Sequence, residues 1–201
     1  MPAIMTVTKN VLVVLYQYFW ISLFLTFVLT MCYLYVFEDN KSGNGLKSSI
    51  KLWLTSFRTS SRFRLLFFLI LYSALIGFRT VFIRELYFNP LRDVFGGWWI
   101  YSTDVEGETF LTTECIENLM LFIPFSFLLY WYLYSKNKDM TKKRVLFVSI
   151  RAVVVFSLVI EFSQLFLKLG TFQFSDLVYN ISGGIIGSFI SLLFVKIFIK
   201  T

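Results

Sequence analysis

Four polar residues that could do chemistry lie in the most apolar part of the chain, "IEFSQLFLKLGTFQFSDLVYNISGGIIG", residues 160–187. Glu161 and Gln164 end one apolar segment, and Asp176 and Asn180 open the next. Two carboxylates in different environments can divide the roles of a general acid and a general base, which makes Glu161 and Asp176 candidate catalytic residues. Carboxylates and amides can equally bind a polar headgroup.

The elements that must position these residues are membrane helices. The 201 residues are 57% hydrophobic and 15% charged, and the mean hydropathy is +0.72, far above that of a soluble domain. There is no His, which removes the commonest general base and the commonest metal ligand, so we expect neither a metal site nor a cofactor. The two cysteines, Cys32 and Cys115, are expected near opposite membrane faces and therefore without a disulfide.

Five uncharged or nearly uncharged stretches have about the length, ~20 residues, that crosses a bilayer. The sequence therefore predicts an all-α, polytopic membrane helix bundle with five transmembrane helices, at residues 10–37, 65–83, 118–134, 145–167 and 177–195. We divide the chain into an N-terminal helix (1–37), a basic loop (38–64) and a four-helix membrane domain (65–198).

The loop charges predict the orientation. Basic residues gather in 38–64, in 135–144 and at the C-terminus, whereas 84–117 is rich in acidic residues. Basic loops stay in the cytoplasm, so we expect the N-terminus outside, the C-terminus inside and a multi-pass protein of the cytoplasmic membrane. The net charge of +7 is explained by these loops beside the lipid bilayer, and no nucleic-acid partner is expected.

Two loop segments have patterns of their own. Apolar residues recur at helical spacing in 46–58, "LKSSIKLWLTSFR", which fits an amphipathic helix on the inner leaflet or a basic loop. The outer segment "DVFGGWWIYS", 93–102, pairs glycines with aromatic residues. It fits a turn at headgroup level, or the floor of a site for an amphiphile.

With this orientation, four helices bring polar residues to one outward-facing layer. Spacing places Glu161, Gln164 and Lys168 on one helix face, and Asp176 and Asn180 on another. The predicted ligand-binding set is Asn118, Glu161, Gln164, Asp176, Asn180 and Arg79. An ionisable residue at membrane depth is a site candidate by default. Other roles remain open: Asp176 or Ser175 as a helix cap, Asn118 and Asn180 as interhelical hydrogen bonds, and Glu161 as an ion-pair partner of Arg79.

Small residues follow Asn180 at four-residue spacing, as Gly183, Gly187 and Ser191. They predict close packing of another helix, and they could also supply the interface of a homodimer.

The order of these motifs resembles the VanZ-like family, named for a teicoplanin-resistance membrane protein. The resemblance rests on "NLMLFIPF" from Asn118, on "EFSQ" from Glu161 and on "FQFSDLVYNISGG" from Phe172, and it covers about 65–195. The chain departs from the pattern at Gly170, where the family commonly has Arg, and at Ser126, where it usually has Gly. A mechanism that needs a loop cation would then use Lys168, Arg79, Arg84 or Arg92. The resemblance implies a bacterial cytoplasmic-membrane protein associated with glycopeptide resistance.

Three functions fit the sequence. The first is a non-enzymatic membrane factor whose outward polar site handles an amphiphile, either the glycopeptide antibiotic or a lipid-linked cell-wall precursor. The second is an intramembrane enzyme that uses Glu161 and Asp176 as an acid/base pair on a lipid headgroup. The third, a transporter, lacks the internal repeat that is usual in such proteins.

Overall fold

A computed structural model describes residues 5, 8, 9, 12, 13, 16–37, 45–82, 86–98, 101–103, 109–111 and 113–198. Within this described part of the chain, five helices are long and apolar enough to cross a membrane. They are α2 (Phe19–Phe37), α4 (Ser61–Gly77, extended to Val81), α5 (Glu114–Lys136), α6 (Lys142–Leu167) and α7 (Phe174–Phe198). The predicted five-helix membrane bundle is confirmed.

The helix ends differ from the predicted ones by a few residues, except at the first span. The sequence predicted that span from residue 10, whereas α2 begins at Phe19, after a turn at Tyr18. At the other spans the helices run further than the uncharged stretch, because charged residues such as Glu114 and Lys136 continue the helix beyond the apolar part. The last turn of the second span is a π-helix, η1 (Phe78–Phe82).

The bundle buries small and hydroxyl-bearing residues together with a core of large apolar ones such as Phe67 and Phe122, and other large apolar residues face outward. In α2, Ser22, Thr26 and Thr30 are fully buried, while Phe24 and Leu25 are exposed. Lipid tails are as apolar as Leu, so packing large apolar side chains inside gains little over leaving them in lipid. Small residues let helix backbones approach closely, and this decides which face turns inward.

The glycines of α7 bring it into backbone contact with α5. A Cβ placed on Gly183 would lie 2.1 Å from the carbonyl oxygen of Leu119, and one on Gly187 would lie 2.1 Å from that of Ile123. The predicted packing role of these small residues is confirmed. Because α5 occupies this face of α7, the face is not free to form a dimer interface, and a homodimer stays a prediction.

The predicted amphipathic helix is present as α3 (Leu46–Thr59). Its Trp53 packs against Phe67 of α4, and the Trp53 indole N–H donates to Thr30 Oγ1 of α2 at 2.9 Å. Leu46 and Leu54 of α3 remain exposed. Ser60 then links α3 directly to α4, and its side chain accepts a hydrogen bond from the backbone N–H of Phe63.

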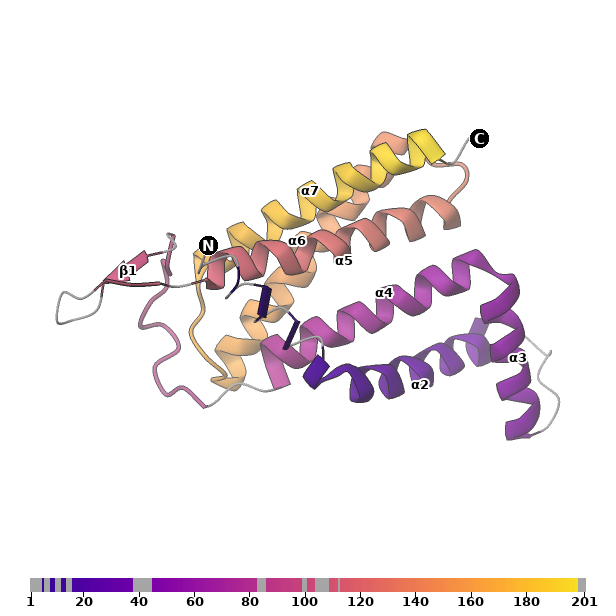
Figure 1. Cartoon of the computed structure of the whole chain (residues 1–201), viewed down its shortest axis with the longest axis horizontal. Helices are drawn as coiled ribbons and strands as arrows, with labels where there is room; N and C mark the ends of the chain where they lie inside the picture. The colour runs from indigo at the N-terminus through magenta and orange to yellow at the C-terminus, as the bar shows by residue number, and fades with distance from the viewer. Residues whose placement is uncertain are drawn as a thin grey trace.

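The two ends of the bundle carry different connections (Figure 1). One end holds α3, the turn between α5 and α6, and the C-terminus. The other holds residues 86–98, the turn between α6 and α7, and a short antiparallel hairpin of β1 (Tyr101–Thr103) and β2 (Thr109–Leu111). The sequence analysis did not predict this hairpin, whose strands are rich in residues with high β-propensity (Tyr, Thr, Phe). The candidate site residues belong to the hairpin end.

Candidate functional site

Four of the six predicted site residues are buried between α6 and α7. The exposed fraction is 1% for Glu161, 2% for Gln164, 8% for Asp176 and 4% for Asn180. Asn118, on α5, is half-buried. Most of the residues predicted to form the polar layer are therefore buried inside the bundle, at the end that carries the hairpin, and we keep the name polar layer for them.

Glu161 holds the turn between α6 and α7 in place. Its Oε2 accepts a hydrogen bond of 3.2 Å from the backbone N–H of Gln173, the residue before α7 begins. The N–H groups at the start of a helix have no partner within the helix, so a carboxylate there satisfies one of them and favours the positive end of the helix dipole.

Gln164 connects α6 to η1. Its Nε2 donates to the carbonyl oxygen of Thr80 at 2.8 Å. Thr80 lies in the last turn before Phe82, where carbonyl groups lack partners within the helix, so the amide satisfies a group that would otherwise be buried unpaired.

For Asn180 the sequence had left open an interhelical hydrogen bond, and for Asp176 a role as helix cap. The Asn180 Nδ2 donates to Ser157 Oγ of α6 at 3.0 Å, which confirms an interhelical hydrogen bond. Helix α7 begins at Phe174, so Ser175 and Asp176 lie within its first turn, and neither is the residue that caps it. A carboxylate in the first turn still stabilises the helix through its dipole.

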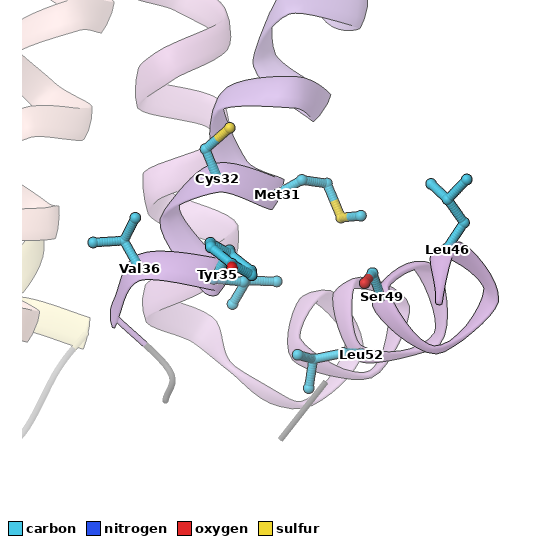
Figure 2. A pocket seen from close by; sticks show the side chains of 8 residues that line it. Met31, Cys32, Tyr35, Val36, Leu46, Ser49 and Leu52 are labelled. Carbon is cyan, nitrogen blue, oxygen red and sulfur yellow. The ribbon is translucent and has the colours of Figure 1, made fainter. Parts of the chain in front are cut away.

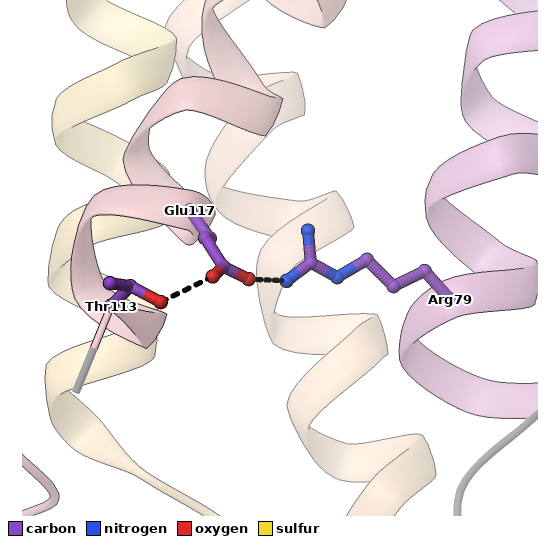
Figure 3. A network of polar contacts seen from close by, with 3 residues as sticks. All are labelled: Arg79, Thr113 and Glu117. Atoms are coloured by element: carbon purple, nitrogen blue, oxygen red, sulfur yellow. Dashed lines mark hydrogen bonds and ion pairs between the residues drawn. The ribbon is translucent and has the colours of Figure 1, made fainter. Parts of the chain in front are cut away.

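Arg79 pairs with a residue that the sequence analysis did not select. Figure 3 shows its guanidinium in an ion pair with Glu117 of α5, whereas Glu161 had been considered as the partner. Thr113 Oγ1 donates to the other oxygen of Glu117 at 2.5 Å. Glu117 had been counted in the acidic outer loop, but α5 begins three residues before it.

The structure removes Lys168 from the predicted face. Helix α6 ends at Leu167, and Lys168 takes a left-handed conformation with φ 55° that turns its exposed side chain off the face of Glu161 and Gln164. Gly170 follows with φ 113°, a conformation that an Arg would adopt only with strain. The absence of the family's Arg at this position thus has a local conformational reason.

Residues 86–98 and 168–174 form a cover over the polar layer, joined by main-chain hydrogen bonds. Tyr87 donates to the carbonyl of Lys168 at 2.6 Å, Phe172 to that of Pro90 at 2.9 Å, and Phe174 to that of Val94 at 2.8 Å. We call these two segments the loop cover.

A glycine lets the loop cover lie directly on α7. Gly96 has φ 68°, and a Cβ there would lie 2.1 Å from Ser175 Oγ. This confirms the turn predicted at the paired glycines. Nearby, Tyr179 of α7 donates its hydroxyl to the carbonyl of Trp98 at 2.7 Å, and the rings of Trp98 and Phe174 lie 6.3 Å apart. Trp99 and the side chain of Tyr101, also predicted at headgroup level, lie outside the described residues.

The loop cover exposes apolar side chains. Phe88, Leu91 and Phe95 are 86%, 58% and 78% exposed. At the end of a membrane bundle, such side chains lie where headgroups and acyl chains meet, so the cover presents an apolar surface beside the buried polar layer.

Several buried polar atoms of this region have no hydrogen-bond partner among the described residues. They are Gln164 Oε1, Asn180 Oδ1, Ser175 Oγ and Arg79 Nη1. Nearly all buried polar groups in proteins are paired with protein or ordered water, so this cluster of unpaired acceptors and donors indicates a place for water or for polar groups of a ligand.

The part of the chain that the structure describes has no group of three or more His, Cys, Asp or Glu side chains close enough to hold an ion. A hollow of about 340 Å³ lies between α2 and α3, with a mostly apolar lining that includes Met31, Cys32 and Leu52 (Figure 2). Helix α3 lies at the end of the bundle opposite the hairpin (Figure 1). The buried polar groups, not this hollow, mark the candidate site.

Sequence reasoning missed the partners of the residues that it selected. Glu117, Thr80, Ser157 and Gln173 each complete a contact of a predicted residue. Only Glu117 carried a signal, since Arg79 needs an anion and Glu117 directly precedes the predicted Asn118. The other three contribute backbone groups or a hydroxyl, which no spacing rule distinguishes.

A family model described as VanZ/LLP1 matches residues 18–195. The match extends beyond the expected 65–195 and takes in α2 and α3. No curated protein and no solved structure matches the chain. The match covers most of the sequence and includes every residue of the polar layer described above, and on this basis the chain belongs to the VanZ/LLP1 family.

Proposed function

We propose that this protein contributes to glycopeptide resistance, with teicoplanin as the relevant drug, by handling an amphiphile at the polar layer. The ligand is the antibiotic itself or a lipid-linked cell-wall precursor. The observation that carries the proposal is the group of buried polar atoms without partners under the loop cover, at Gln164, Asn180, Ser175 and Arg79. Keeping such groups inside a membrane bundle costs several kcal/mol unless something binds them.

The shape of the region supports an amphiphile rather than a small polar solute. The buried layer offers a carboxylate pair, two amides and a guanidinium to a polar headgroup. The exposed Phe88, Leu91 and Phe95 of the loop cover offer apolar surface to a lipid chain. A ligand with both parts matches both surfaces.

The proposed location is the outer face of a bacterial cytoplasmic membrane. The loops at the α3 end are basic and the segment 84–117 is acidic, so the positive-inside rule places the N-terminus outside and the C-terminus inside. The polar layer then faces the leaflet where cell-wall precursors are used and where glycopeptides act.

The central test compares Glu161→Gln and Asp176→Asn with the wild type in bacteria challenged with teicoplanin and vancomycin. We expect the wild type to protect against the lipid-bearing teicoplanin and both variants to lose most of that protection, because each removes a buried charge from the layer. Protein in the membrane fraction is quantified for every strain, so that loss of protein is not mistaken for loss of function.

Glu114→Gln is the matched control, because Glu114 is an exposed carboxylate at the same end of the bundle. It should protect as well as the wild type. Full protection by Glu161→Gln at normal membrane levels would overturn the proposed site.

A second candidate function rests on the burial of both carboxylates. Glu161 of α6 and Asp176 of α7 are 1% and 8% exposed, so two buried carboxylates lie on neighbouring helices. An acid/base reaction on a lipid headgroup would use such a pair. Mass spectrometry of membrane lipids and wall precursors, with and without the protein, tests it, and an unchanged set of species would exclude it.

A further inference from the structure

A pocket with several polar residues in its lining lies between α2, α4 and α5, at the end of the bundle opposite the polar layer. It has a volume of about 200 Å³ and is lined by Arg62 and Lys136 together with the hydroxyls of Tyr33, Ser60 and Tyr132. None of the described residues that line it is a carboxylate. Among the described residues, neither cation forms an ion pair with a carboxylate. We call this the basic pocket.

The groups of the basic pocket converge from three helices and are held in place. The Lys136 Nζ lies 5.9 Å from the centre of the Tyr132 ring, within cation–π range. Tyr33 of α2 and Tyr132 of α5 line the same hollow, so both helices contribute to the pocket wall. Two cations and several hydroxyls around one hollow are donors for the oxygens of an anion.

The start of α4 adds to this charge. Ser60 precedes the first residue of the helix, so the pocket lies at the positive end of the α4 dipole. A helix start alone would not define a site, but here it coincides with a concave surface and with two cations from different helices that form no ion pair among the described residues.

The depth of the pocket indicates what carries the anion. Phe63 and Leu66 also line it, and both lie on the membrane side of Arg62 along α4. The cations therefore stand at the ends of the helices, at headgroup level, and apolar surface continues toward the bilayer centre. This order of charge and apolar surface matches a headgroup with an acyl chain beneath it.

We infer that the basic pocket binds the phosphate group of an anionic phospholipid in the leaflet that the α3 end of the bundle faces. The recognised chemistry is a phosphate oxyanion, which a soluble phosphate ester also carries. The apolar floor of Phe63 and Leu66 selects the lipid. The pocket is separate from the polar layer, which lies at the other end of the bundle.

The test measures lipid binding to the full chain purified in detergent. Phosphatidylglycerol or phosphatidylcholine is titrated, and bound lipids are counted by native mass spectrometry. The wild type should retain one phosphatidylglycerol in preference to phosphatidylcholine. Arg62→Gln and Lys136→Gln should each weaken that binding about fivefold, the effect of about 1 kcal/mol for a cation near an anionic headgroup.

Lys143→Gln is the matched control, because Lys143 is an exposed cation at the same end of the bundle but outside the pocket. It should bind like the wild type. Equal binding of the two lipids, no effect of either pocket variant, or an equal loss with Lys143→Gln would overturn the pocket as a lipid site.

Two further measurements separate the remaining outcomes. Glycerol 3-phosphate and inorganic phosphate are added as competitors, and displacement of the lipid at similar concentrations would show a soluble phosphate ester as the ligand and exclude the lipid-specific inference. Thermal unfolding of each variant reports folding. If Arg62→Gln does not fold, Lys136→Gln tests the same pocket from a different helix.

Discussion

Glu161 and Gln164 each form a hydrogen bond with a main-chain group of a different neighbouring element. Glu161 bonds the N–H before α7, and Gln164 bonds a carbonyl of η1, so both hold the ends of helices in register. Gln164 uses only its nitrogen for this, and its oxygen remains buried without a partner among the described residues. The hydrogen bond to Thr80 fixes the Gln164 side chain, so the Gln164 oxygen points in a defined direction.

The Arg79–Glu117 pair permits a prediction at the same scale. The two side chains are 17% and 6% exposed, so removing one partner leaves the other as a buried, uncompensated charge. We expect Glu117→Gln, and likewise Arg79→Gln, to lower the free energy of unfolding by about 3 kcal/mol. The measurement is reversible unfolding of the protein in detergent.

The double variant Arg79→Gln/Glu117→Gln distinguishes a pair from two independent contributions. Neither charge is then left alone, so most of the lost stability should return. Losses that simply add would show that the two residues are not energetically coupled. Glu114→Gln, an exposed change one turn earlier, should stay within about 0.5 kcal/mol of the wild type.

Among the elements, α5 and α7 fit each other most closely. Gly183 and Gly187 bring α7 against two carbonyl oxygens of α5, and Ser126, where the family usually has Gly, lies at the same contact. A Cβ on Gly187 would be 2.2 Å from Ser126 Oγ. Because α7 has Gly at position 187, α5 can carry the hydroxymethyl group of Ser126 at this contact. One glycine in the helix pair gives enough space, so α5 does not need the Gly that the family usually has at position 126.

Gly187→Ala should separate the two helices and destabilise the protein by about 1–3 kcal/mol, because a backbone carbonyl cannot rotate away as a side chain can. Gly77→Ala is the control: Gly77 lies within the long helical span, and a Cβ there has nothing within 4 Å. That change should be neutral or stabilising by about 0.5–1 kcal/mol, since Ala favours the helix. Thermal unfolding in detergent compares them, and equal effects would contradict the packing role of Gly187.

Hydropathy and loop charge predicted the elements well, and they predicted the contacts only partly. Long apolar stretches identify membrane helices because a helix satisfies the hydrogen bonds of its own backbone within lipid. Helix α3 was predicted from the helical spacing of its apolar residues. The burial of Glu161, Gln164, Asp176 and Asn180 also followed. The pairing of Arg79 with Glu117 was not predicted. The uncharged stretch begins only after Glu117, whereas α5 begins at Glu114, so Glu117 was assigned to the outer loop instead of the helix. The exposed position of Lys168 was also not predicted. Lys168 itself takes the left-handed conformation that ends α6, and Lys is not a residue type that indicates this conformation in a sequence.

At the scale of the whole molecule, the protein has a polar layer at one end and a basic pocket at the other. The helices that connect them bury small residues together with large apolar ones, and they also expose large apolar side chains. By the positive-inside rule, the basic loops of the α3 end predict which leaflet each end of the molecule meets.

Cysteine labelling tests this orientation. In a Cys32→Ser/Cys115→Ser background, Phe95→Cys reports the loop cover and Lys138→Cys the turn between α5 and α6, and both positions are exposed. A membrane-impermeant maleimide should label Phe95→Cys in intact cells, and Lys138→Cys only after lysis. The reverse pattern would place the polar layer in the cytoplasmic leaflet and contradict the proposed function.

The hydrogen bonds of the loop cover also set the order in which the protein can be completed. The segment 86–98 bonds to residues 168–174, which the ribosome adds about 80 positions later. At about 5–20 residues per second, this segment waits on the order of 4–16 s before its partners are made. By the end of that interval the nascent chain has four membrane helices and no completed site, so a product truncated there would be inserted in the membrane with an incomplete site. The site is assembled only when the last hairpin, α6 with α7, enters the bilayer.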